Sequence, residues 1–532
     1  MQISRRDLFR SAAAVGGAAA LGGLSAEAVA GTGPAARAAR SATTRTAVLL
    51  RGAADPATGW RPVVRGPGER HVVRSGLGAT AKKGRARRRR PLAAFVQLSD
   101  VHIIDAQSPI RLEFGDVVSS SAYRPQEILS GHVADAMARE INAIGVGPVT
   151  GRKLAFAIQT GDNADTTQYN EIRWNIDILD GGTVAIDSGD PTKYEGVMDQ
   201  VPEFYDEVFW HPDGTPEGAA DDLPRAQHGF PTIPGLLDAA RAPFEAEGLS
   251  MPWYAAMGNH DGLVQGNWPI TDAQNAQAMG SIKKVKVGKG TVDRTVTPDP
   301  DRRLLERSEW VQEHFTTTGT PEGHGFTAEN VAKKTAYYYF DQGKVRFVVL
   351  DTVATFGDKG ALNSAQFQWL KKVLDQSRRK LVVLASHHPL SSFEDTTLAD
   401  RVARELASRE NVIAWINGHT HTNHIWAHPR REKGKVVGGF WEINTASHID
   451  WPQQSRLLEI TDNADGTVSI FTTMVDHGGA LAFDGDLTDP VQLAGLSREI
   501  GANDWQEQDN QRRGARNARN VELIVPAPRF LR

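Results

Sequence analysis

The chain has 532 residues, which is too long for one ordinary domain, so it holds either one domain enlarged by insertions or two domains. Charged residues make up 23% and hydrophobic residues 40% of the sequence, which is typical of a soluble globular protein and excludes the disordered and fibrous classes. The formal net charge of −4 does not indicate that the protein as a whole binds nucleic acid or membranes. The absence of cysteine excludes disulfides, thiolate metal sites and a cysteine nucleophile. Any metal ion must therefore be bound by His, Asp, Glu or Asn.

The first 30 residues predict an export signal. The paired arginines Arg5 and Arg6 precede the apolar stretch "SAAAVGGAAALGGL", which is followed by the small residues of "AEAVAG". This order resembles a twin-arginine signal peptide, with cleavage near Ala30, and implies the twin-arginine export machinery as a partner. The apolar stretch is too short and too rich in glycine for a stable membrane span. We therefore expect a mature protein without a transmembrane span that is extracellular, associated with the cell wall or periplasmic.

Residues 31–90 are predicted to be an N-terminal extension with little recognisable chemistry. The extension ends in the basic run "KKGRARRRR", residues 82–90. Such a run is either a solvated flank that protects the next apolar strand from aggregation, or a patch that steers anionic molecules. The sequence leaves both interpretations open.

From Pro91 onward, segments with the period of strands alternate with segments with the period of helices. "LAAFVQLSD" and "KLAFAIQTGD" predict strands, and the helical spacing between them predicts a parallel β-α-β unit. A further helix is predicted from "SAQFQWLKKVLDQS". Later strands are predicted from "WYAAMGNHD", "TAYYYFDQGKVRFVVLDT", "KLVVLASHHP", "VIAWINGHTH", "GGFWEINTAS" and "SRLLEITDNADGTVSIFTTMV". The order indicates a mixed α/β fold with antiparallel hairpins toward the end.

Possible metal ligands follow five of these hydrophobic strands. In open α/β sheets the carboxyl ends of the strands form the ligand crevice, so these side chains are expected to meet at one rim. Each cluster alone is weak evidence, but the five in this order are strong evidence. The clusters are "SDVH" with Asp100 and His102, "TGDNAD" with Asp162, "GNHD" with Asn259, His260 and Asp261, "SHHP" with His387 and His388, and "NGHTH" with His419 and His421.

The ligand types predict a site for two metal ions. Asp, Asn and His suit manganese, iron or zinc, in divalent or trivalent form, rather than copper or an iron–sulfur cluster. Asp162 is the natural bridge, because a carboxylate has two oxygens and the glycine before it lets the backbone come close. Two ions about 3.5 to 4 Å apart can acidify a bridging water and bind the attacking and leaving oxygens of a phosphoester.

This ordered set of motifs resembles the calcineurin-like metallophosphoesterase superfamily over about residues 92–475. The resemblance implies a four-layer α/β/β/α sandwich of two mixed sheets, with long insertions. It also implies that His260 donates a proton or stabilises a phosphate oxygen, and that Asp261 orients it. Of His387 and His388 the first is chosen as the ligand, because it follows the apolar run directly, and His388 is left without a role. The implied ligands are Asp100, His102, Asp162 and His421 for one metal, and Asp162, Asn259, His387 and His419 for the other.

Departures from relatives narrow the expected activity. Purple acid phosphatases of this superfamily carry a tyrosine ligand where this chain has Asp165, and its protein phosphatases carry an arginine where this chain has Met257. "TGDNADTTQY" is more similar to the bacterial branch that cleaves cyclic nucleotides and glycerophosphodiesters. We therefore expect an exported, metal-dependent phosphoric ester hydrolase that favours phosphodiesters. The alternatives are a phosphomonoesterase, a nuclease of the same superfamily, for which only the basic runs at 82–90 and 283–289 argue, and a non-catalytic metal-binding surface protein.

The predicted phosphoesterase domain spans residues 91–475 and contains two insertions. The first, at about 170–250, is rich in Pro, Gly and aromatic residues and is interpreted as a lid or binding loop, with a surface decoration as the alternative. The second, at about 262–335, includes "SIKKVKVGKGTVDR", which resembles a basic hairpin whose lysines either approach the substrate or are solvated. Residues 476–532 are predicted to be a helical or extended C-terminal tail without assigned chemistry.

Overall fold

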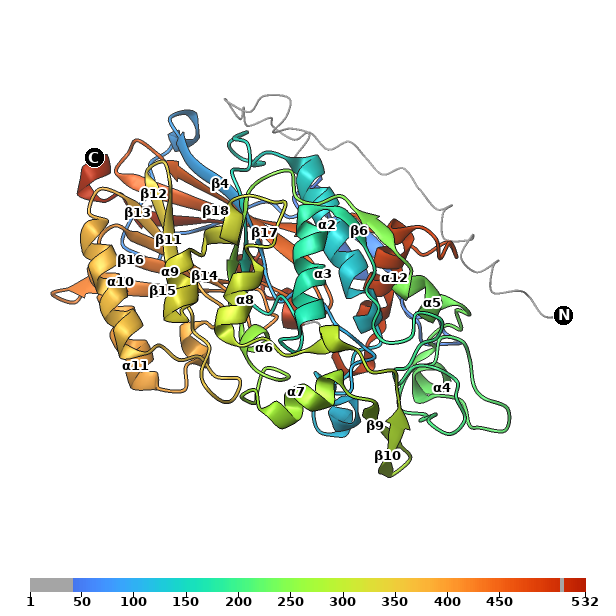
Figure 1. Ribbon diagram of the computed structural model, residues 1–532. Coiled ribbons are helices and arrows are strands. Elements are labelled where there is room, and N and C mark those ends of the chain that lie inside the picture. The colour runs from blue at the N-terminus through green and yellow to red at the C-terminus, as the bar shows by residue number, and fades with distance from the viewer. Residues whose placement is uncertain (1–41, 508–510) are drawn as a thin grey trace, which may run out of the picture.

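The computed structural model describes residues 42–507 and 511–532, so the predicted signal at 1–30 lies outside the described residues. Two large mixed sheets lie face to face at the centre, with helices on both outer sides (Figure 1). This arrangement confirms the predicted α/β class and its two mixed sheets. Among the described residues, no helix is both long enough and apolar enough to span a bilayer.

The first sheet has seven strands in the order β3-β19-β18-β17-β4-β5-β8. Strands β4, β5 and β8 run parallel to one another, and β17 pairs antiparallel with β4. The long β17–β18 hairpin was predicted from the alternating apolar pattern at 455–475. The strands are β3 (Val72–Arg74), β4 (Arg90–Leu98), β5 (Ala157–Thr160), β8 (Trp253–Ala256), β17 (Gln454–Asp462), β18 (Thr467–Asp476) and β19 (Val521–Pro526).

The second sheet has six strands in the order β11-β12-β13-β14-β16-β15. Its four central strands are parallel, and the edge strands β11 and β15 pair antiparallel with their neighbours. Strand β15 was not predicted, because its exposed charged residues hide the strand pattern. The strands are β11 (Tyr338–Gln342), β12 (Val345–Val349), β13 (Leu381–Ala385), β14 (Val412–Asn417), β15 (His424–Glu432) and β16 (Lys435–Asn444).

The predicted β-α-β unit is confirmed by strand β4, helix α2 (Ser130–Ile144) and strand β5. The helical spacing predicted this helix from "PQEILSGHVADAMAREINAI", residues 125–144, but a 3-10 turn at Glu127–Leu129 precedes α2, so the α-helix begins later. It packs on helix α3 (Tyr169–Asp180) and helix α12 (Pro490–Asn503), and these helices form the outer layer of the seven-stranded sheet. Apolar side chains such as Met137 and Ile141 bind this layer to the core.

Alternating side chains of the six-stranded sheet fix the other two layers. Val348 and Val382 point to helix α10 (Ser364–Gln376) and helix α11 (Thr396–Ser408), whereas Phe347 faces the first sheet, where its ring centroid lies 5.0 Å from that of Phe95. The spacing of Phe367, Leu370 and Leu374 puts the buried stripe of α10 on one side, as predicted. The result is the predicted α/β/β/α order of layers.

The two insertions pack together around a second apolar core. Trp210 of the first insertion and Val285 of the second share this core with Leu493 of α12. The first insertion contains β6 (Gly182–Val184), α4 (Leu223–His228), α5 (Leu236–Arg241) and β7 (Phe244–Ala246). The second contains α7 (Asp272–Met279), β9 (Ile282–Val287), β10 (Gly290–Thr295), α8 (Arg307–Glu313) and α9 (Ala328–Lys333).

The lysines of the β9–β10 hairpin are held by carboxylates. Lys283 is fully buried, and its Nζ lies 2.8 Å from Glu113 Oε1. Lys284 binds Asp293 and Lys286 binds Asp206, in each case at 2.8 Å. These three lysines are therefore paired with carboxylates of the protein: Asp293 lies on the partner strand β10, whereas Glu113 and Asp206 lie outside the hairpin.

Both ends of the described chain join the domain. β1 (Ala47–Arg51) pairs with β2 (Val63–Pro67), and β3 extends the seven-stranded sheet beside β19. Helix α12 and strand β19 belong to the segment that was predicted to be a C-terminal tail, and both lie within the layers of the fold. In the basic run 82–90, Arg85 and Arg89 bind Glu522 of β19 at 2.8 and 2.7 Å. Part of that run therefore anchors the C-terminal strand.

Candidate metal centre

The structure brings all the predicted metal ligands to one rim. Asp100 follows β4, Asp162 follows β5 and Asn259 follows β8, and all three of these strands are parallel. His387 follows β13 and His419 follows β14, which are parallel in the other sheet. The carboxyl ends of both parallel sets therefore supply the site, as the sequence predicted.

The first group of possible ligands consists of Asp100, His102, Asp162 and His421. One ligand atom from each of these buried residues lies within 4.8 Å of the others. His421 Nε2 lies 3.3 Å from both Asp100 Oδ1 and His102 Nε2. Four imidazole and carboxylate groups can therefore face one cation.

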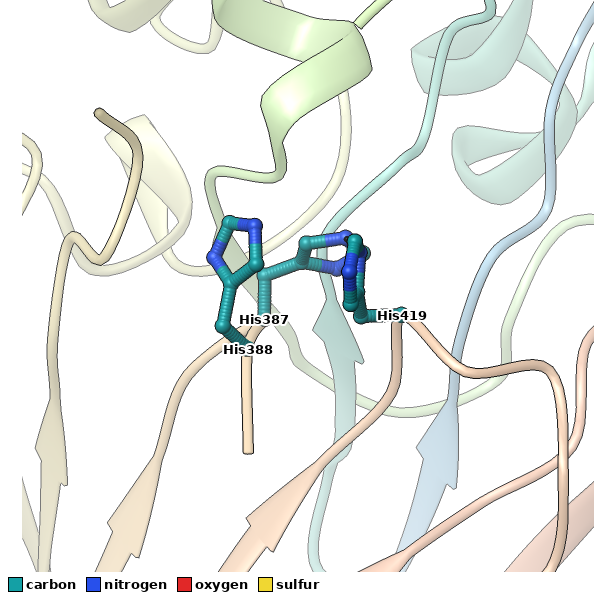
Figure 2. A group of neighbouring side chains, drawn as sticks. All are labelled: His387, His388 and His419. Atoms are coloured by element: carbon teal, nitrogen blue, oxygen red, sulfur yellow. Dashed lines mark hydrogen bonds between the residues drawn. The ribbon is translucent and has the colours of Figure 1, made fainter. Parts of the chain in front are cut away.

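The second group consists of His387, His388 and His419 (Figure 2). Their ligand nitrogens also lie within 4.8 Å of one another, and His387 Nε2 is 3.3 Å from His419 Nδ1. His387 Nε2 also lies 3.0 Å from Asp162 Oδ2, whereas His102 Nε2 of the first group lies 3.7 Å from the same oxygen. Asp162 thus stands between the two groups, at the position that a bridging carboxylate requires.

Asn259 begins the short helix α6 (Asn259–Gly262) beside these groups. Its Nδ2 donates a hydrogen bond of 3.1 Å to the carbonyl of Gly266, which fixes the orientation of the side-chain amide. Its Oδ1 is buried and has no hydrogen-bond partner in the described part of the chain. Because buried acceptors are almost always paired in folded proteins, this oxygen fits a metal ligand.

His388 joins the second group, although the sequence analysis gave it no role. Its side chain is buried, Nδ1 lies 2.9 Å from Thr352 Oγ1, and Nε2 has no hydrogen-bond partner. Its ring centroid lies 4.5 Å from that of His419. The adjacent histidines of "SHHP" were the signal for this residue, but the sequence could not show that both rings turn inward.

The backbone is strained where the candidate ligands sit. Asp100, His102, Asp162, His419 and His421 all have positive φ angles, between 49° and 71°. Residues other than glycine rarely adopt this conformation, and it costs on the order of 1 kcal/mol each and clusters at functional sites. Two glycines permit the close approach of the strands: a Cβ on Gly161 would lie 2.6 Å from His387 Nδ1, and one on Gly418 would lie 2.3 Å from Asp100 Oδ2.

Buried carboxylates lie behind two of the imidazoles. His102 Nδ1 is 2.9 Å from Asp165 Oδ1, and His421 Nδ1 makes a short hydrogen bond with Asp450 Oδ2. Each contact places the proton on Nδ1 and leaves Nε2 free to face the site, as in carboxylate–histidine–metal arrangements. Sequence reasoning noticed Asp165 only as the replacement for a tyrosine, and it missed Asp450, which lies in a loop outside every recognised motif.

Arginines in turn hold these carboxylates. Arg111, which is fully buried, binds Asp165 and also lies 2.8 Å from Glu127 Oε2. Arg124 Nε lies 2.7 Å from Asp450 Oδ1, and Arg512 approaches the other oxygen of Asp450 at 3.3 Å. The arginines come from segments remote in sequence, so their convergence could not be read from the motifs.

The charges of the site favour a bound cation. Burial raises the pKa of Asp162, but the charges of His387 and His260 hold it well below its usual range. Burial lowers the pKa of His387, but Asp162 and Asp100 raise it to about 9. Burial and the charge of His387 lower the pKa of His419 to about 3. The carboxylates therefore stabilise positive charge near Asp162, and a bound metal cation would supply such charge.

Of the two predicted catalytic residues, His260 is partly exposed and Asp261 is buried. The His260 side chain is 22% exposed, and its Nδ1 lies 2.6 Å from the backbone carbonyl of Asp165. Asp261 was expected to orient His260, but its carboxylate instead accepts hydrogen bonds from the backbone amides of Gly258, Asn163 and Ala164 at 2.8 to 3.0 Å. Because Asp261 lies at the N-terminus of α6, its oxygens reach amides of the turn more readily than the neighbouring ring. The main chain at 165, rather than Asp261, sets the orientation of His260.

Comparison with known proteins agrees with the site. Residues 235–423 match the protein-family model for the calcineurin-like phosphoesterases, which confirms the resemblance to that superfamily over this part of the chain. The chain has no match among curated proteins.

Three solved structures of phosphoesterases are similar to the chain at low identity. A dimetal phosphatase from Danio rerio has 13% identity and a TM-score of 0.36, over 73% of this chain and 100% of that one. A purple acid phosphatase from yellow lupin has 11% identity and a TM-score of 0.32, over 71% and 51%. A 5′-nucleotidase from Candida albicans has 11% identity and a TM-score of 0.25, over 69% and 47%. With TM-scores below 0.5, these likenesses decide nothing about the site.

Proposed function

We propose that this chain, with its calcineurin-like phosphoesterase match, is an exported hydrolase of phosphoesters that uses two transition-metal ions. The observation that carries the proposal is the meeting of two ligand groups at Asp162, whose Oδ2 lies 3.0 Å from His387 Nε2 and 3.7 Å from His102 Nε2. Asn259 Oδ1, which is buried without a hydrogen-bond partner among the described residues, adds a further possible ligand after β8.

The residues present fit two manganese, iron or zinc ions. One would be held by Asp100, His102, Asp162 and His421, and the other by Asp162, Asn259, His387 and His419, with His388 beside the second set. When bound, such ions acidify water and neutralise the charge that develops on a phosphoester. The choice among these metals rests on ligand type alone.

His260 supports proton transfer to the leaving group. Its contact with the carbonyl of Asp165 places a proton on Nδ1, so Nε2 is the nitrogen available to a substrate. Its side chain is 22% exposed, whereas that of His387 is fully buried, so a substrate can reach His260. Protonated His260 would donate from Nε2 to the departing oxygen, and an imidazole suits this role near neutral pH.

We favour phosphodiesters over phosphomonoesters because the arginines that the structure describes beside the site are already paired with carboxylates. Arg111 is bound to Asp165 and Glu127, and Arg512 is bound to Asp450 and Glu507. A monoester dianion needs more compensation than a diester monoanion. The ratio of kcat/KM for bis-p-nitrophenyl phosphate to that for p-nitrophenyl phosphate tests this preference, and a ratio below one would contradict it.

The alternatives find less support. A nuclease would need basic surface, but Arg85 and Arg89 of one basic run bind Glu522, and Lys283 of the other is buried against Glu113. A non-catalytic metal-binding protein would not need the partly exposed His260. Salt-dependent DNA binding tests the first alternative, and a chelator-sensitive assay with monoesters and diesters tests the second.

Three variants of the metal-loaded protein test the main proposal. Asp162→Ala is expected to abolish both the hydrolysis of bis-p-nitrophenyl phosphate and the metal content, because both ligand groups lose their shared carboxylate. His260→Ala is expected to lower turnover by about 100-fold or more while the metals remain, as loss of a general acid does. Glu329→Ala, which removes an exposed carboxylate on α9, is the control. Wild-type activity in Asp162→Ala would overturn the proposal.

Export rests on the sequence of residues 1–30 and is proposed separately. Replacing Arg5 and Arg6 by lysine is expected to keep the full-length precursor inside the cell, because the twin-arginine route reads that pair. Immunoblots of cell and medium fractions measure this. Normal export of the double-lysine variant would contradict the proposed route.

A further inference from the structure

Solvent reaches the candidate metal centre beside two of its imidazoles. His260 and His419 are partly exposed, whereas His102, His387 and His388 are buried. A phosphoester that enters the site must therefore pass these two rings. Whatever borders them will contact the organic part of the substrate.

The turn at residues 263–270 borders His260. A Cβ on Gly266 would lie 2.4 Å from His260 Cδ2, and Gln265 Nε2 donates a hydrogen bond of 3.2 Å to Asp165 Oδ2. The turn is closed by a hydrogen bond of 2.8 Å from the amide of Val264 to the carbonyl of Trp268. Trp268, only two residues beyond Gly266, leaves 40% of its surface exposed.

The loop at residues 353–360 borders the other side. A Cβ on Gly360 would lie 2.7 Å from the Cβ of His388, whose ring lies 4.5 Å from that of His419. This loop carries Phe356, which is 63% exposed. The amide of Gly357 donates a hydrogen bond of 2.7 Å to the carbonyl of Asn267 and so joins the loop to the turn. Trp268 and Phe356 each lie one residue from that bond.

We propose that Trp268 and Phe356 form a subsite for an aromatic ring in the phosphoester substrate, such as a nucleobase or an aryl group. The proposal rests on the phosphoesterase function proposed above and specifies its substrate class. Flat aromatic faces stack on planar rings and are tolerant of which ring they meet.

The turn and the loop that carry the two aromatic residues lie against His260 and His388, and this continuity with the metal centre selects the occupant. A ligand that fills both places needs an anionic group for the metal ligands and an apolar group for the rim. An apolar residue exposed at the far edge of the sheet lacks this relation. Val73, for example, is 53% exposed on β3, at the edge of the seven-stranded sheet opposite β8.

Two phosphonates that differ only in their organic group test the subsite. Phenylphosphonate and methylphosphonate binding to the full chain loaded with Mn²⁺ is measured by calorimetry. Wild type is expected to bind phenylphosphonate about 10-fold more tightly, and the double variant Trp268→Ala, Phe356→Ala is expected to lose that advantage while methylphosphonate binding changes less than about 2-fold. Trp268→Phe, which keeps an aromatic face, is expected to retain most of the advantage, and Val73→Ala is the matched control.

The possible results distinguish failure of the aromatic subsite from failure of the proposed phosphoesterase function. Equal binding of the two phosphonates to wild type, or equal weakening of both in the double variant, would overturn the aromatic subsite and leave the phosphoesterase proposal standing. Cyclohexylphosphonate binding as tight as that of phenylphosphonate would also overturn it, because an apolar rather than an aromatic group would then be selected. Failure of wild type to bind methylphosphonate at all would count against the proposed function itself.

Discussion

The imidazoles of the candidate metal centre fall into two sets that differ in what lies behind each ring. His102 and His421 have the buried carboxylates of Asp165 and Asp450 at Nδ1. His387 and His388 have neutral partners there, the carbonyl of Thr160 and the hydroxyl of Thr352, each at 2.9 Å. We call these the carboxylate-backed set and the neutral-backed set.

This difference indicates that the two metal positions are not equivalent. A carboxylate behind an imidazole makes the ring a better electron donor and fixes its orientation more strongly than a neutral group does. Burying that carboxylate requires compensation, which Arg111 provides for Asp165, while Arg124 and Arg512 provide it for Asp450. The carboxylate-backed position is therefore expected to bind its metal more tightly, at the cost of a buried charge network.

The largest expected effect follows from breaking that network. Arg111→Met would leave Asp165 and Glu127 buried without their counter-charge, which typically costs about 3–5 kcal/mol of unfolding free energy. Urea unfolding measures the change. Arg346→Met, which removes a guanidinium paired with the partly exposed Asp341, is the control, and it is expected to cost less than about 1 kcal/mol. Equal losses in the two variants would contradict the special role of the buried network.

Removing the charge of one carboxylate should weaken the binding of one metal ion. Asp450→Asn keeps the size of the side chain but removes the negative charge behind His421. Metal affinity is expected to fall by about 10- to 100-fold, the usual effect of losing a group that orients a ligand. Competition with a chelator during metal titration measures it. A fall that affects both metals equally would show that the two sets are not distinct.

A buried carboxylate whose pKa is set mainly by burial, rather than by an ion pair, should respond to pH in the opposite way. Glu499 on α12 accepts a hydrogen bond of 2.7 Å from the amide of Phe483, and burial raises its pKa to about 7. Because its pKa in the unfolded chain is near 4.5, the folded protein binds the extra proton between these values. Its contribution to stability is therefore fully present below about pH 4.5 and is lost as the pH rises through 7.

Glu499→Gln tests this contrast, because it removes the titrating group. The variant is expected to gain stability relative to wild type by on the order of 2 kcal/mol between pH 5 and pH 8. Urea unfolding of both proteins at the two pH values gives the difference. A constant difference across that range would show that Glu499 is charged in the folded protein.

The smallest effect is expected in the neutral-backed set. Thr352→Val keeps the shape of the side chain but removes the hydroxyl that contacts Nδ1 and the backbone amide of His388 at 2.9 and 3.2 Å. We expect a loss of about 1 kcal/mol in unfolding free energy and less than about a threefold change in metal affinity. Chelator competition again measures the affinity. A loss as large as that of Asp450→Asn would remove the distinction between the two sets.

Much of the fold could be predicted because its strands carry strong local patterns. The β-α-β unit, α10 and the β17–β18 hairpin were predicted at close to their observed positions, since their apolar residues follow the period of the element. Strand β15 was missed because exposed charged residues interrupt its apolar pattern. Helix α11 was not identified, although its buried residues Ala399, Val402 and Leu406 recur at helical spacing. The places of β3 and β19 in the large sheet depend on pairing between the two ends of the chain, which no local pattern encodes.

The candidate ligands were accessible from sequence because chemistry and position coincide there. A hydrophobic stretch followed by Asp-x-His or His-x-His predicts both a strand and the type of ligand at its end. The sequence therefore identified the candidate ligands Asp100, His102, His419 and His421. The groups behind them lie in ordinary loops, and Asp450 and Arg512 belong to no motif. Their roles depend on distances between remote segments.

The sequence by itself determined the kind of site: oxygen and nitrogen ligands at the ends of buried strands, enough for two cations, with one aspartate suited to join them. Only the tertiary structure decided which carboxylate stands behind which ring, that His388 turns inward, and that Asp261 binds backbone amides rather than His260. The physical reason is that ligand identity is a property of single residues. Orientation, burial and charge compensation are properties of segments that meet only when the chain is folded.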